Sequence, residues 1–76
     1  MYKFPMLLDA KTSEEKLAVL AEQTAYLCGP FRSKADLYSA VRFTVKRDKE
    51  ESDLINLSQE AWNAAVDSAF AKQRLM

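Results

Sequence analysis

The 76-residue chain contains no histidine, one cysteine and one glycine. Without histidine it lacks the commonest general base and the commonest metal ligand, and it cannot form a Ser–His or Cys–His nucleophile pair. A single cysteine, Cys28, excludes both an internal disulfide and a four-ligand zinc site. One glycine is too few for a Gly-rich phosphate loop. We therefore expect a protein that is not an enzyme and that uses no metal or other cofactor.

Long apolar runs are also missing. None approaches the ~18–20 residues that a membrane-spanning helix needs, so we expect a cytoplasmic protein with no membrane partner. The length predicts one domain, residues 1–76. A domain this small has little room for a ligand cleft of ~300 Å³ or more. It is also marginally stable alone, and without disulfides or metals it needs very regular helix packing or self-association.

Helices are favoured by what the chain does contain. Eleven alanines accompany only two prolines and one glycine, and alanine has the highest helix propensity. We predict a mainly α fold, a small three-helix domain. Residues 2–10 are expected to form an extended N-terminal arm, because Pro5 disfavours a helix there.

The first helix is predicted at about 13–28. Thr12 and Glu15 have the spacing of a capping box, and Gly29 is expected to end the helix in a left-handed conformation. Cys28 is interpreted as a small buried hydrophobic residue. One stripe of the helix is predicted to face the core, formed by Leu17, Leu20, Thr24 and Leu27.

A second helix is predicted to start at Ser33, with Asp36 three residues later as a weak capping box. Its buried side would carry Leu37, Val41, Thr44 and Val45. The alternation of Val41, Phe43 and Val45 is also typical of a strand, so an α+β fold with a β-hairpin at about 41–57 stays open as the alternative. A third helix is predicted near Ser58. One of its faces would carry Trp62, Val66, Ala69 and Phe70.

Charge is distributed unevenly although the net charge is zero. Residues 31–49 hold six basic and two acidic residues, a net charge of +4, whereas residues 50–76 carry −3. A basic middle segment beside an acidic end is typical of a solvated helix face, of a docking surface for an acidic protein, or of a phosphate-binding surface.

Our first hypothesis is a protein–protein interaction module, a small regulator or inhibitor that binds a larger protein and self-associates as a dimer. Small neutral proteins that act by binding often come from phage or plasmid accessory genes, so we expect a protein of that origin. Aromatic and arginine residues are favoured at interface hot spots. The predicted partner-binding residues are Tyr26, Phe43, Trp62, Arg42, Lys46 and Arg47.

The alternative is a nucleic-acid-binding regulator. A helix, a short turn and a second basic helix resemble a helix-turn-helix in outline. The second helix would then contact the nucleic acid through Lys34, Ser39, Arg42 and Lys46. The neutral net charge argues against this hypothesis, because nucleic-acid-binding domains usually carry a positive excess.

Overall fold

The computed structural model describes residues 10–47 and 49–75, without the side chains of residues 49–52 and 75. This part of the chain forms three α-helices and two 3-10 helices and contains no strand. The elements are α1 (Ser13–Cys28), α2 (Lys34–Arg47), η2 (Lys49–Asn56), α3 (Gln59–Lys72) and η3 (Gln73–Leu75). The mainly α prediction is confirmed. The predicted arm at 2–10 lies, except for Ala10, outside the described residues.

The hairpin alternative at about 41–57 is wrong. Residues 41–47 continue α2, and η2 follows in place of a second strand. The alternating residues Val41 and Val45 are both fully buried, whereas Phe43 is exposed. A helix explains this pattern, because residues four apart share one of its faces and a residue two positions away lies on another. The side chains at 41 and 45 therefore pack on the core together.

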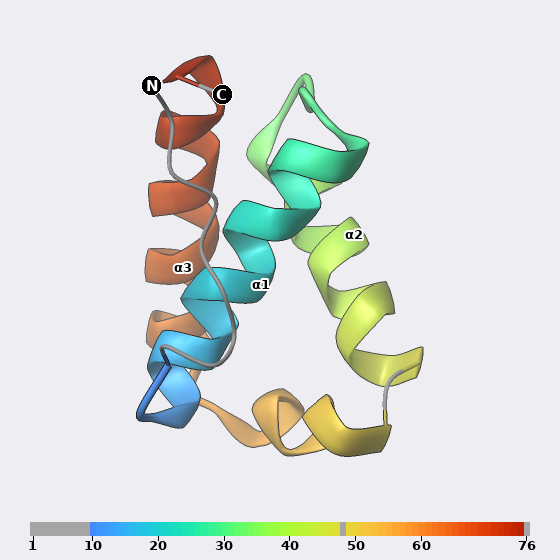
Figure 1. The fold of residues 1–76 in the computed structure, drawn as a ribbon, viewed down its shortest axis with the longest axis vertical. Coiled ribbons are helices and arrows are strands. Elements are labelled where there is room, and N and C mark those ends of the chain that lie inside the picture. Colours follow the sequence, from blue (N-terminus) through green and yellow to red (C-terminus); the bar gives the residue numbers. More distant parts are fainter. Residues whose placement is uncertain (1–9, 48, 76) are drawn as a thin grey trace.

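Figure 1 shows how the helices are arranged. In this view α3 stands on one side and α2 on the other, and α1 runs diagonally between them. The η2 segment crosses the lower end and connects α2 to α3. Because α1 packs against α2, α3, η2 and η3, it forms the centre of the fold.

The predicted helix starts are confirmed by their caps. Thr12 Oγ1 accepts a hydrogen bond from the Glu15 N–H at 3.1 Å, and Glu15 Oε2 accepts one from the Lys11 N–H at 2.7 Å. Ser33 Oγ accepts from the Asp36 N–H at 3.2 Å, and Ser58 Oγ accepts from the Ala61 N–H at 3.1 Å. Each cap satisfies a backbone N–H that has no partner within its own helix.

The core joins all three α-helices and η2. Its largest side chain is Trp62, which is 1% exposed and whose Nε1–H donates to the Leu54 carbonyl oxygen at 2.9 Å. This bond ties η2 to α3. The core consists of Leu17, Leu20, Ala21, Ala25, Leu37, Val41, Val45, Leu54, Trp62, Ala65, Val66 and Ala69.

A side-chain amide fastens the turn between α1 and α2 to the end of α3. Gln73 Oε1 accepts from the Phe31 N–H at 3.0 Å, and Gln73 Nε2 donates to the Phe31 carbonyl oxygen at 2.9 Å. Nearby, the Lys72 ammonium pairs with the Glu22 carboxylate of α1. The turn position is therefore set by residues more than forty positions later in the chain.

The last turn of α1 corrects two predictions. Leu27, expected on the buried stripe, is 71% exposed, and Cys28, expected to be buried, is also exposed. The other three members of the stripe are buried. A groove of about 170 Å³ separates this turn from Thr44 and Arg47 of α2. The two residues are exposed because α2 does not cover the end of α1.

Gly29 is required at the end of α1 for a different reason from the one predicted. Its φ of −84° is not left-handed. Its N–H donates to the Ala25 carbonyl oxygen at 3.0 Å, and a Cβ atom on residue 29 would lie well inside van der Waals distance of that oxygen and 3.2 Å from the Ala25 carbonyl carbon. The glycine permits this close approach of backbone to backbone.

Gly29→Ala is therefore expected to destabilise the protein by about 1–3 kcal/mol, the usual cost of forcing extra atoms into a packed site. The measurement is urea denaturation followed by circular dichroism. Arg32→Ala, at an exposed position of the same turn, serves as the control and should change the free energy of unfolding by less than about 0.5 kcal/mol. Equal stability of the two variants would contradict this explanation.

Candidate functional site

An exposed apolar and basic surface lies where the end of α1 meets the C-terminal half of α2. Its apolar residues are Leu27 and Phe43, which are 71% and 65% exposed. Its basic residues are Lys46 and Arg47, both exposed on the last turn of α2. We call these four residues the Phe43 face.

Arg47 lies beside the Phe43 ring and shares a groove with Leu27. The Arg47 guanidinium lies over the Phe43 ring, 5.7 Å from its centroid. Arg47 and Leu27 border the same groove between α1 and α2. The flat face of the guanidinium covers part of the ring while its N–H groups stay available to solvent or a ligand.

Trp62 and Arg42 do not lie on an exposed surface, which their predicted role in partner binding requires. Trp62 is a core residue and offers no surface for a partner. Arg42 is half-buried, and its guanidinium lies over the Trp62 ring at 5.9 Å from the centroid. Trp62 and Arg42 lie together, but residues of α2 cover Trp62, which was predicted to contact a partner. Arg42 is thus partly a packing residue.

Tyr26 is exposed, as predicted, but not on the Phe43 face. It is 47% exposed and lines a separate hollow of about 260 Å³ with Ala25, Gly29 and Gln73. Tyr26 and Leu27 are neighbours on α1, so their side chains point about 100° apart around the helix. Of the six predicted partner-binding residues, the structure brings Phe43, Lys46 and Arg47 together on one surface.

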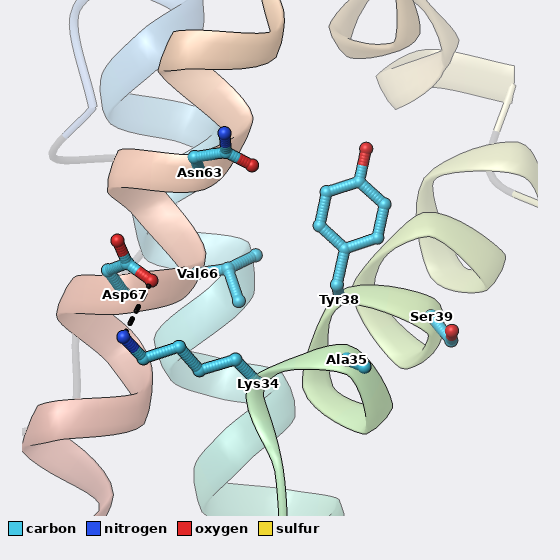
Figure 2. Close-up of a pocket in the computed structure, with 7 residues that line it drawn as sticks. All are labelled: Lys34, Ala35, Tyr38, Ser39, Asn63, Val66 and Asp67. Carbon is cyan, nitrogen blue, oxygen red and sulfur yellow. Dashed lines mark ion pairs between the residues drawn. The ribbon is translucent and has the colours of Figure 1, made fainter.

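A second feature, which sequence reasoning missed, is a cleft of about 400 Å³ between α2 and α3. The expectation that the domain has little room for such a cleft is wrong, because α2 and α3 diverge and leave a hollow over Val66. Figure 2 shows the side chains that line it. They are Lys34, Ala35, Tyr38, Ser39, Asn63, Val66 and Asp67.

The cleft is bounded by polar contacts at both ends. At one end Lys34 extends from the start of α2 across to α3, and its Nζ lies 3.2 Å from Asp67 Oδ1 (Figure 2). At the other end Gln59 Nε2 donates to the Tyr38 hydroxyl at 3.1 Å and to Asn63 Oδ1 at 3.0 Å. These contacts connect α2 and α3 on either side of the apolar floor.

The four predicted nucleic-acid contacts do not form one basic surface. Lys34 is paired with Asp67, and Arg42 is held over Trp62. Ser39 borders the cleft, and Lys46 belongs to the Phe43 face. The three cations are Lys34, Arg42 and Lys46. Among the described residues, only Lys46 of these three is exposed and forms neither an ion pair nor a ring contact.

Within residues 10–47 and 49–75, no helix is long and apolar enough to span a bilayer. The same part of the chain contains no group of three or more Cys, Asp or Glu residues placed to hold a metal ion. Comparison of the chain with protein-family models, with curated proteins and with solved structures finds no match.

Proposed function

We propose that this chain is a non-catalytic protein-interaction module whose Phe43 face binds an amphipathic segment of another protein, one that carries acidic residues beside apolar ones. The observation that carries the proposal is the exposure of Leu27 and Phe43 next to two cations. These two are the most exposed large hydrophobic side chains of α1 and α2, whereas Leu17, Leu20, Leu37, Val41 and Val45 are buried in the core. Apolar side chains grouped at the surface are typical of partner sites.

The charges argue for an acidic partner. Among the described residues, Lys34 and Lys72 form ion pairs with Asp67 and Glu22, but Lys46 and Arg47 form none. Cations at the rim of an apolar surface raise the rate of association with acidic partners and disfavour basic ones. An arginine stacked on an aromatic ring is also a frequent hot-spot arrangement. The Phe43 face thus combines an apolar centre with a basic rim.

A photo-crosslinking experiment tests the proposal. The photoreactive amino acid p-benzoylphenylalanine replaces Phe43 in one variant and Glu60, an exposed residue on α3, in the control variant. Irradiation in the native cell is expected to join the position-43 variant to a discrete protein, whose crosslinked peptide carries Asp or Glu beside apolar residues. The position-60 variant is expected to lack this product, and excess unlabelled protein should suppress it.

Three results would contradict the proposal. The first is the same set of products from both variants, and the second is no protein product from position 43. The third is a product that contains a second copy of this chain. In that case the Phe43 face would mediate self-association and would not bind a different protein. Sedimentation equilibrium at micromolar concentration checks that third result independently. Retention on duplex DNA at low salt, lost steeply as salt rises, would favour the nucleic-acid alternative instead.

A further inference from the structure

We propose that the cleft between α2 and α3 is a binding site for a small zwitterion with an apolar side chain, such as a free apolar amino acid. This site lies apart from the Phe43 face and does not depend on the function proposed for that face. The inference rests on three properties of the cleft: its volume, its fixed apolar wall and the opposite charges at one end.

The volume suits a ligand of this size. A water molecule occupies about 30 Å³ in the liquid, so about 400 Å³ corresponds to roughly a dozen waters. Phenylalanine has about as many non-hydrogen atoms. Small-molecule sites in proteins usually begin at about 300 Å³. The cleft is therefore large enough for one amino acid.

The apolar part of the cleft is held in place by the core. Val66 is 3% exposed and forms the floor, with Ala35 beside it on α2. The Tyr38 ring forms one wall and packs against Trp62, with ring centroids 5.4 Å apart and planes at 53°. The hydrogen bond from Gln59 fixes the other end of the tyrosine. Because the wall is preformed, binding of an apolar side chain carries no further entropic cost of ordering the site.

The charged end selects the ligand. Lys34 and Asp67 are side by side, and their side chains are 59% and 57% exposed. An ion pair this exposed contributes little to stability, so a ligand can replace it at small cost. An incoming carboxylate would accept from the Lys34 ammonium, and an incoming ammonium would donate to the Asp67 carboxylate.

A ligand with only one charge fits less well. A simple anion would face the Asp67 carboxylate, and a simple cation would face the Lys34 ammonium, whereas a zwitterion satisfies both. The start of α2 lies at Lys34, and the positive end of the helix dipole there further favours a carboxylate at that end. Asn63 lines the far end of the cleft and accepts through Oδ1 from Gln59.

The test is a titration of the ¹⁵N-labelled full chain with L-phenylalanine, followed by NMR, at concentrations up to about 20 mM, which cover millimolar dissociation constants. Saturable shifts are expected at the amides of Ala35, Tyr38, Asn63, Val66 and Asp67. N-acetylphenylalanine lacks the ammonium and phenylalaninamide lacks the carboxylate. Each should bind about two- to fivefold more weakly, because each loses one ion pair to an exposed group, which contributes up to about 1 kcal/mol.

Matched variants separate the cleft from general charge effects. Lys34→Gln should weaken phenylalanine binding about two- to fivefold. Lys46→Gln removes the same charge from the same helix outside the cleft and should leave binding unchanged. Ala35→Phe, which fills the cleft from an exposed position, should abolish binding while the protein stays folded. Shifts that do not saturate, or equal effects of Lys34→Gln and Lys46→Gln, would overturn the site. Equal binding of the three ligands would overturn the zwitterion assignment.

Discussion

Trp62→Ala is expected to lower the free energy of unfolding by about 3–5 kcal/mol, the usual cost of removing a buried aromatic side chain. Total stability scales at roughly 0.05–0.15 kcal/mol per residue, so a chain of this length has about 4–11 kcal/mol in all. The midpoint of thermal unfolding should therefore fall by at least about 12 °C, because 1 kcal/mol shifts the midpoint of a domain this size by about 4–8 °C. The measurement is the thermal transition in the helical circular dichroism signal.

The size of this effect follows from how many elements meet at Trp62. Its Nε1–H bonds to the Leu54 carbonyl, and its ring supports Tyr38 and Arg42 of α2. Trp62→Phe keeps most of the packing but removes the hydrogen bond, and it should cost about 1–3 kcal/mol. Phe43→Ala removes an exposed aromatic and should change stability by less than about 0.5 kcal/mol. Comparable losses from Trp62→Ala and Phe43→Ala would contradict the assigned core.

Phe43→Asp is expected to have the opposite profile, with a large loss of partner binding and little loss of stability. The aspartate removes the exposed ring and repels acidic groups on the partner. A hot-spot residue contributes about 2 kcal/mol or more, which corresponds to a binding constant at least about 30-fold weaker. The measurement is titration of the crosslinked partner, identified through position 43, against each variant, with stability checked by circular dichroism.

Ser68→Asp is the matched control, because Ser68 is exposed on α3, which stands on the other side of α1 from α2 (Figure 1), and the change adds the same charge. It should weaken partner binding by less than about threefold, since surface charges outside a contact act only at long range. If both aspartate variants weaken binding equally, net charge rather than the Phe43 face governs recognition. If neither does, the proposed interface is wrong.

The helix boundaries could be predicted because caps are local. Thr12, Ser33 and Ser58 each use a side-chain oxygen to bond a backbone N–H three residues later, and such spacing is visible in the sequence. The burial of Leu37, Val41 and Val45 in α2 and of Val66 and Ala69 in α3 also followed from helical spacing. The η2 segment could not be predicted, since its eight residues are too few for apolar periodicity to separate a short helix from a hairpin.

The candidate sites were only partly predictable, because exposure depends on where helices cross. Phe43, a predicted partner-binding residue, is exposed because it lies off the buried side of α2. Leu27 lies on the predicted stripe but outside the area that α2 covers. The Lys34–Asp67 pair joins residues from two separate helices, and the cleft exists because those helices diverge. No local pattern encodes such a divergence.

The double hydrogen bond between Gln73 and Phe31 has a consequence for synthesis of the chain. The turn that orients α2 on α1 is fastened by a residue 42 positions later, and α1 packs most extensively on α3. While the ribosome is still translating α3, the nascent α1–α2 pair lacks both the Gln73 hydrogen bonds and the helix that packs most extensively on α1. The order of translation therefore delays native packing until α3 has left the exit tunnel, and the apolar side of α1 is open to chaperones until then.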